Sequence, residues 1–291
     1  MIPRRLLKNV RRIQIHTTRL VDNFFAGEYH SVFKGRGIEF HQVREYQPGD
    51  EVRAIDWNVT ARIGRPFIKE FVEERELTVM LAVDISSSGH FGTHEKFKNE
   101  LAAELGAVLA FSAIRNNDKV GLLLFTDRIE KFIPPKKGKR HVLRVIRELL
   151  FFEPKHRGTD IAAALKFLST LSKRRTVTFL ISDFFAKNYE RSLQIANRRH
   201  DVIAVLLTDP RERRLPPLGF VELVDAESEE TMVVNTRPPH VRRAFEEMTG
   251  KAMEKRERFL RSIAVDCIKI ETDKPYLEPL VRFFRMRERR R

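Results

Sequence analysis

The sequence predicts an α/β protein with a doubly wound, mainly parallel six-stranded sheet, an N-terminal helix and a small β-containing region. From residue 78 onward, short apolar runs alternate with amphipathic helical stretches, an order typical of parallel sheets with helices on both faces. The apolar runs are continuous, as in strands buried on both faces. With 291 residues, 42% of them hydrophobic, the chain is long enough to bury such a core.

The first 77 residues contain two kinds of sequence. Residues 3–25 place apolar side chains at helical spacing between arginines, which predicts a basic amphipathic helix. Residues 28–77 are punctuated by glycine and proline, and within them 50–57 is interpreted as a short helix capped by Asp50 and 67–72 as a strand. We therefore expect residues 1–77 to form the helix and the small region, and residues 78–291 to form the main domain.

The main domain is predicted to contain six strands and six long helices. Its strand at 128–133 should pair with the preceding strand across a tight turn. Residues 210–237 interrupt the alternation with two prolines and two short strand candidates, 220–224 and 231–234, so they are interpreted as a hairpin insertion. The predicted strands of the sheet are 78–83, 120–125, 128–133, 176–182, 202–207 and 263–270, and the helices are 94–115, 139–150, 160–172, 187–199, 238–262 and 275–288.

Oxygen-bearing side chains follow three elements at the expected carboxyl edge of this sheet, where ligands of doubly wound proteins bind. Alternate residues of an extended chain point to the same side, so Asp84, Ser86 and Ser88 can converge. Thr159 and Asp183 would join them from neighbouring loops. Carboxylate and hydroxyl oxygens without nitrogen or sulfur suit a hard octahedral cation, Mg²⁺ or Mn²⁺.

The net charge of such a site favours binding over hydrolysis. Its two carboxylates balance one divalent cation, and its hydroxyls donate weakly, so the metal stays electrophilic. It can then take an Asp or Glu of another protein as its sixth ligand. The competing interpretation of Asp84, Ser86 and Ser88 is a polar turn after a strand.

These residues resemble the metal-ion-dependent adhesion site of von Willebrand factor A domains: Asp84-x-Ser86-x-Ser88, Thr159 and Asp183 occur in the same order. The resemblance covers about residues 78–209 and 238–288. It implies a von Willebrand A-like fold and a metal-dependent protein-binding module. Arg157 departs from the pattern, since many members have glycine there, and it would add a positive charge at the site mouth.

A second run is similar to the signature of the domain-of-unknown-function family 58: Tyr46–Arg62, YQPGDEVRAIDWNVTAR. Lys69, Glu70 and Phe71 also fit that family. The resemblance implies a soluble member that acts beside a MoxR-type AAA+ ATPase in maturing or assembling other proteins. From the residues alone, Asp50, Arg53, Asp56 and Arg62 are expected to form an ion-pair network beneath Trp57, which would stabilise this region or present a binding face.

The formal charge of +15 leaves other partners open. Residues 1–40 hold eight Lys or Arg and three acids, and residues 282–291 hold six Arg and one Glu. The basic ends could therefore dock on an anionic membrane surface. Nucleic-acid binding is a weaker alternative, because no helix-turn-helix, RNA-recognition or zinc-finger signature is present. The sequence does not indicate an oligomeric state.

Several function classes are excluded or disfavoured. The single cysteine, Cys267, permits no intrachain disulfide and reads as a small buried residue. No apolar run approaches the ~18 residues of a membrane span, and no secretory signal is evident, so a cytoplasmic protein is expected. A phosphatase with Asp84 as nucleophile would lack its general acid, because Ser86 stands where such enzymes have a second Asp. We therefore expect a non-enzymatic module.

Overall fold

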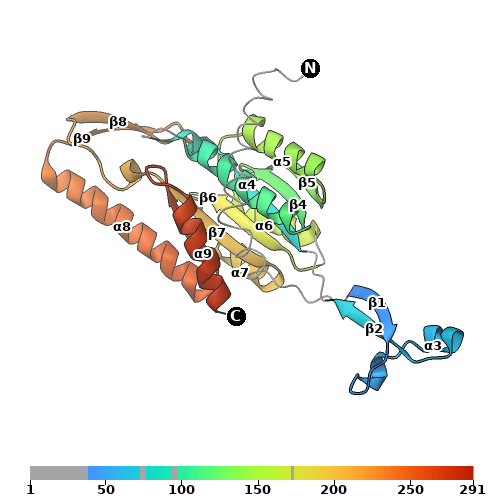
Figure 1. Ribbon diagram of the computed structural model, residues 1–291. Coiled ribbons are helices and arrows are strands. Elements are labelled where there is room, and N and C mark those ends of the chain that lie inside the picture. Colours follow the sequence, from blue (N-terminus) through green and yellow to red (C-terminus); the bar gives the residue numbers. More distant parts are fainter. Residues whose placement is uncertain (1–38, 73–76, 93–96, 172–173, 291) are drawn as a thin grey trace. The chain divides into compact units, whose positions relative to one another are not determined.

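A computed structural model describes residues 39–72, 77–92, 97–171 and 174–290. They form two compact units, one within Phe33–Leu77 and one that holds the described residues from Thr78 on (Figure 1). The helix predicted for residues 3–25 lies outside the described residues.

The larger unit is built on a six-stranded sheet with the strand order β10-β7-β6-β3-β4-β5. All neighbouring strands are parallel except β5, which runs antiparallel to β4. This confirms the predicted doubly wound, mainly parallel sheet, including the tight turn before its edge strand. The strands are β3 (Thr78–Asp84), β4 (Lys119–Phe125), β5 (Ile129–Lys136), β6 (Val177–Ser182), β7 (Asp201–Thr208) and β10 (Asp266–Glu271).

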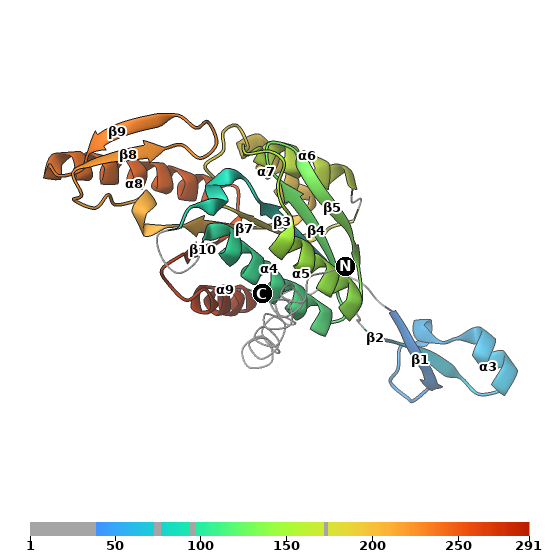
Figure 2. The ribbon, with the colours of Figure 1, turned by 90° about the horizontal axis from the view of Figure 1, so that it is seen from above.

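Helices cover both faces of this sheet (Figure 2). Helices α4 and α5 pack against each other on one face, where α9 also lies against β10. On the other face, side chains of α6, α7 and α8 join one apolar cluster with Met80, Leu123 and Leu180 of the strands. None of the described helices is long and apolar enough to span a bilayer. The helices are α4 (Lys98–Arg115), α5 (Lys139–Phe151), α6 (Ile161–Leu171), α7 (Glu190–Arg199), α8 (Pro239–Ser262) and α9 (Leu277–Arg289).

The central strands are buried because their sequences are apolar on both faces. In β3 every residue from Val79 to Asp84 is buried, and in β6 all six residues are. The middle of β4 holds Gly121, where a Cβ atom would lie 2.5 Å from the Met80 sulfur. Glycine there lets the Met80 side chain of the neighbouring strand cross the sheet surface.

The insertion after β7 begins with a short 3₁₀ helix, η4 (Pro210–Glu212), and continues into a hairpin. Strands β8 (Phe220–Val224) and β9 (Thr231–Asn235) pair only with each other, as a two-stranded antiparallel sheet. Within its turn, Asp225 accepts hydrogen bonds from the backbone of Glu227 and Ser228. The two strands lie where the sequence predicts them.

The smaller unit is a second hairpin, β1 (Glu39–Glu45) and β2 (Phe67–Val72), joined by η2 (Val52–Ala54) and α3 (Trp57–Ile63). The predicted strand at 67–72 is present. Strand β1 was not predicted, because its sequence mixes charged and apolar residues without a clear period. A positive φ at Gly64 ends α3.

Two predictions for this unit are wrong. Within the predicted helix 50–57 only the 3₁₀ helix η2 forms, and Asp50 does not cap it; the α-helix begins after Asp56, whose carboxylate accepts from the backbone of Asn58 and Val59. Asp50 binds Arg44 instead, through two hydrogen bonds of 2.8 and 2.7 Å. The ion-pair network expected beneath Trp57 does not form, since Asp56 pairs with Lys69 and Trp57 is 66% exposed.

Cys267 lies in β10 and packs against the apolar cluster. Burial raises the pKa of its thiol from 9.0 to about 11. At pH 8 this lowers the reactive thiolate fraction about 100-fold. We expect iodoacetamide to label Cys267 about 100-fold more slowly in the folded protein than in urea, as measured by mass spectrometry. Equal labelling rates in the two states would contradict the burial of this thiol.

Candidate metal-binding site

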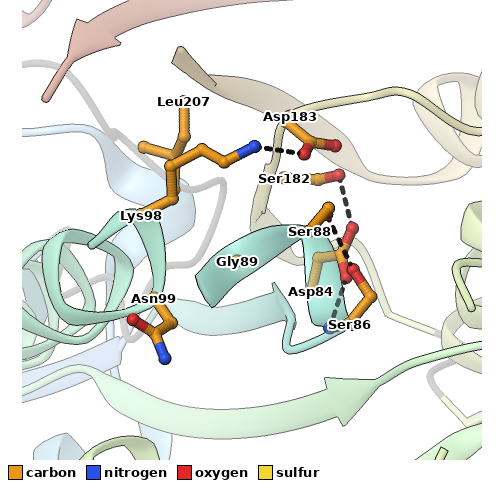
Figure 3. A pocket seen from close by; sticks show the side chains of 9 residues that line it. All are labelled: Asp84, Ser86, Ser88, Gly89, Lys98, Asn99, Ser182, Asp183 and Leu207. Atoms are coloured by element: carbon orange, nitrogen blue, oxygen red, sulfur yellow. Dashed lines mark hydrogen bonds and ion pairs between the residues drawn. The ribbon is translucent and has the colours of Figure 1, made fainter. Parts of the chain in front are cut away.

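Four of the five predicted ligands line one pocket at the carboxyl edge of the sheet (Figure 3). Strands β3 and β6 are parallel neighbours that end at Asp84 and Ser182. Residues that follow parallel strands meet at the same edge, so the loops after β3 and β6 converge. The pocket is lined by Asp84, Ser86, Ser88, Gly89, Lys98, Asn99, Ser182, Asp183 and Leu207.

Asp84 is buried and fully hydrogen-bonded at the end of β3. The Ser182 hydroxyl donates to Asp84 Oδ2 at 2.7 Å, and the Ser86 backbone N–H donates to Oδ1 at 3.0 Å. Burial, together with the nearby charge of Asp183, raises the pKa of Asp84 to about 6. The carboxylate is therefore held in a fixed position in a site that already carries negative charge.

The two predicted serine ligands face each other beside Asp84. The Oγ atoms of Ser86 and Ser88 lie 3.0 Å apart. A short 3₁₀ helix, η3 (Ser87–His90), follows Ser86. The Ser87 N–H donates to the Arg157 carbonyl at 2.9 Å, which fixes this loop against the loop that precedes α6. The convergence predicted from the Asp-x-Ser-x-Ser spacing is thus present in the structure.

Asp183 contacts Lys98, a residue that was not predicted to belong to the site. The Lys98 Nζ atom lies 2.6 Å from Asp183 Oδ2 and 2.6 Å from Glu212 Oε1. Lys98 is only 2% exposed, and Figure 3 shows its side chain crossing the pocket toward Asp183. A buried cation therefore already sits among the predicted ligands.

The charges of this triad depend on one another. Burial opposes the charge of Lys98, but Asp183 and Glu212 outweigh it and raise the pKa of the ammonium above its ordinary value. Burial also raises the pKa of Glu212, against the effect of Lys98. Lys98 consequently remains charged, and its charge offsets part of the negative potential of the pocket.

A signal for Lys98 was available in the sequence. The predicted buried face of the helix over 94–115 includes Leu101 and Leu105, and Lys98 lies three residues before Leu101 on that same face. Phe97, the residue before Lys98, is 47% exposed at the N-terminus of α4. A lysine on a buried helix face requires an acidic partner, which would have pointed to this site.

Thr159, the fifth predicted ligand, has another partner. Its hydroxyl donates to Glu227 Oε1 at 2.6 Å, and it is not among the pocket-lining residues. Asp160 caps the following helix by accepting from the Ala163 N–H. The structure thus brings Thr159 to the neighbouring loop without turning its hydroxyl into the pocket.

The turn of the β8–β9 hairpin contacts the loop that precedes α6. Besides the contact between Glu227 and Thr159, the Arg157 guanidinium pairs with the Glu229 carboxylate. The positive charge that Arg157 was expected to add at the site mouth is therefore paired with an acid of the insertion. Glu227 and Glu229 were not predicted, because no local pattern links them to residues some 70 positions earlier.

The sequence matches the family described as "Protein of unknown function DUF58" over residues 42–256. The chain belongs to the DUF58 family. The uncharacterized protein Rv1480 of Mycobacterium tuberculosis is 30% identical over 288 residues, which cover 98% of this chain and 90% of that protein. YeaD of Bacillus subtilis is 30% identical over 107 residues, 37% of this chain and 25% of that protein.

Solved structures with a similar arrangement share little sequence with this DUF58 chain. An aerotolerance-related membrane protein from Bacteroides fragilis is 15% identical, with a TM-score of 0.49 over 74% of this chain and all of that one. BatB from Bacteroides thetaiotaomicron is 14% identical, with a TM-score of 0.44 over 73% of this chain and 99% of that one. The SpRpn10 VWA domain is 12% identical, with a TM-score of 0.40 over 71% and 94% of the two chains.

The donor set of this DUF58 protein fits a hard divalent cation. Asp84, Ser86, Ser88 and Asp183 supply oxygen donors only. Within the described residues, no group of three or more His, Cys, Asp and Glu side chains is arranged to hold a metal ion. In this pocket the serine hydroxyls would serve as metal ligands beside the two carboxylates.

Proposed function

We propose that this DUF58 protein is a non-enzymatic, metal-dependent protein-binding module. The observation that carries the proposal is the convergence of Asp84, Ser86, Ser88 and Asp183 on one pocket at the carboxyl edge of the sheet. Asp84, Ser86, Ser88 and Asp183 would hold Mg²⁺ or Mn²⁺, with Thr159 as a further ligand when its hydroxyl is free of Glu227. The metal would supply an electrophilic centre for an Asp or Glu carboxylate of a client protein.

The chemistry of the pocket favours binding over catalysis. Both oxygens of Asp84 accept hydrogen bonds, from Ser182 and from the Ser86 backbone, so this carboxylate is poorly placed to act as a nucleophile. Ser86 occupies the position where a phosphatase of this type would need an acid. Lys98 is paired with two carboxylates, which keeps its amine protonated and unreactive.

The proposed cellular role is that of a cytoplasmic adaptor or co-chaperone of a MoxR-type AAA+ ATPase, in maturing proteins or assembling complexes. Membership of the DUF58 family supports this partner, through the association that the family signature implies. The lone, partly buried cysteine is consistent with a reducing compartment. A pull-down of the cognate ATPase with and without Mg²⁺ tests the partnership, and failure to recover the ATPase in either condition would count against it.

The basic ends remain the alternative route to a partner, a membrane surface or a nucleic acid. In the C-terminal segment, Arg282 pairs with Glu278, Arg290 with Asp266, and Arg287 with Asp201 and Asp266. These ion pairs offset the charge of three of the six arginines in residues 282–291, which supports the pocket over the C-terminal segment as the proposed binding site.

Magnesium binding by calorimetry tests the metal site. The wild-type protein is expected to bind one Mg²⁺, and Asp84→Asn should weaken binding at least about 10-fold, because it removes one of two charged ligands. Asp273→Asn, at an exposed position in the turn after β10, is the matched control and should bind like the wild type. Equal affinities of the wild type and Asp84→Asn would sink the proposal.

A further inference from the structure

The pocket already contains a cation that belongs to the chain. The ammonium of Lys98 lies 2.6 Å from Asp183 Oδ2, and the lysine is buried among the predicted metal ligands. The second oxygen of that carboxylate, Oδ1, accepts from the Phe185 backbone N–H at 3.1 Å. Both oxygens of Asp183 are therefore engaged, and Oδ2 is engaged by a positive charge.

We propose that Lys98 is the resident cation of this pocket and that its ammonium competes with a divalent metal for Asp183. The inference rests on the proposed metal site and specifies how this chain controls it. A metal ligand that is ion-paired to a lysine is less available, since like charges repel within the same pocket. Metal affinity would then be set by how readily Lys98 leaves Asp183.

Glu212 gives Lys98 a second partner outside the pocket lining. Its Oε1 lies 2.6 Å from the lysine nitrogen, and its Oε2 accepts from the Asp209 N–H at 3.0 Å. The Asp209 side chain accepts from the Arg211 N–H, so η4 holds Glu212 in place. Lys98 can release Asp183 and keep Glu212, which makes Glu212 a positioning residue for the competing ammonium.

Two aromatic rings restrict the lysine to this region. The Lys98 nitrogen lies 6.0 Å from the ring centroid of Phe91 and 5.9 Å from that of Phe185. Such contacts are favourable for a cation that has lost its water. The ammonium is thus held by two carboxylates and two rings, an arrangement that requires no bound metal for its charges to be satisfied.

The test measures Mn²⁺ binding by calorimetry and the thermal midpoint with and without saturating Mn²⁺. Lys98→Gln is expected to bind Mn²⁺ about 10-fold or more tightly than the wild type, because one positive charge has left the pocket. Its thermal midpoint should rise more with Mn²⁺ than that of the wild type, since a ligand stabilises the fold according to its affinity. Lys274→Gln, an exposed lysine paired with Glu271, is the control and should match the wild type.

A second variant guards against misfolding. The double variant Lys98→Gln with Glu212→Gln removes the ammonium together with a carboxylate that would otherwise lose its partner. It should show the same gain in Mn²⁺ affinity as Lys98→Gln. Unchanged affinity in both folded variants, or no binding by any protein, overturns the inference. If the variants bind Mn²⁺ and the wild type does not, the inference is supported, but the proposal that the wild-type protein functions through a bound metal is contradicted. Wild-type binding that the variants do not improve leaves the proposed metal site in place and discards the role of Lys98.

Discussion

Replacing Lys98 by methionine is expected to lower the free energy of unfolding by about 3–5 kcal/mol, the usual cost of removing one partner from a buried ion pair. Lys98 is 2% exposed and lies 2.6 Å from each of two carboxylates. Methionine fills a similar volume, so the loss reports charge more than packing. Without the ammonium, the buried Asp183 and the largely buried Glu212 would be two negative charges with no cation between them. Urea denaturation followed by circular dichroism gives the measurement.

The pH dependence of this variant separates charge from packing. Burial raises the pKa of Glu212 and Lys98 lowers it, so removing Lys98 raises that pKa further. A raised carboxyl pKa means that the folded state keeps a proton that the unfolded state has released. Stability then falls as the pH rises from the pKa of the unfolded carboxyl, 4.5, to the higher pKa of Glu212 in the folded variant. The destabilisation of Lys98→Met should be larger at pH 8 than at pH 5. A loss that is independent of pH would indicate a packing defect.

Two other variants complete this comparison. Lys274→Met removes an exposed ammonium from its 2.6 Å contact with Glu271 and should leave stability close to that of the wild type, because water screens exposed ion pairs. Lys98→Met combined with Asp183→Asn and Glu212→Gln replaces the charged triad by neutral side chains. It should recover most of the lost stability, because a buried ion pair contributes less than its disruption costs.

The fold was predictable because its strongest signals are local. Each central strand is an uninterrupted apolar run, and the direct alternation with amphipathic helices leaves few topologies besides a doubly wound sheet. Strand β1 and the first residue of α3 were harder to predict from the sequence. Pro48-Gly49-Asp50 has the composition of a helix start, but Asp50 binds Arg44, and the capping role passes to Asp56. The contacts of Asp50 with Arg44 of β1 and with the Gln47 backbone distinguish two acids of equal capping propensity.

The pocket was partly predictable for the same reason. Asp84, Ser86 and Ser88 lie within five residues, and Asp183 follows a recognisable strand, so their convergence is a property of the sheet edge. The contacts that define the pocket's charge are not local. Lys98 meets Asp183 and Glu212 across 85 and 114 positions of the sequence, and Thr159 meets Glu227 across 68. These pairings depend on where a helix and an inserted hairpin pack, which spacing alone does not specify.

Truncating Phe125 to alanine is expected to destabilise the protein by about 3–5 kcal/mol and to disturb the site as well. Phe125 ends β4, is fully buried in the apolar cluster and lies opposite Asp84 in the strand register. Its carbonyl accepts from the Ile85 N–H at 3.0 Å, which ties the start of the Asp84–Ser88 loop to β4. The cavity left by the ring would lie beneath this loop, and the surrounding helices can close it only in part.

The size and location of that effect can be checked with graded substitutions. Phe125→Leu keeps most of the apolar volume and should cost about 1–1.5 kcal/mol, whereas Phe220→Ala, at a residue 79% exposed in the hairpin, should change stability by less than about 0.5 kcal/mol. Hydrogen exchange should increase in residues 84–88 of Phe125→Ala and remain unchanged in α9. If exchange rose equally in both places, the ring would stabilise the domain as a whole and would have no particular part in holding Asp84 at the edge of the sheet.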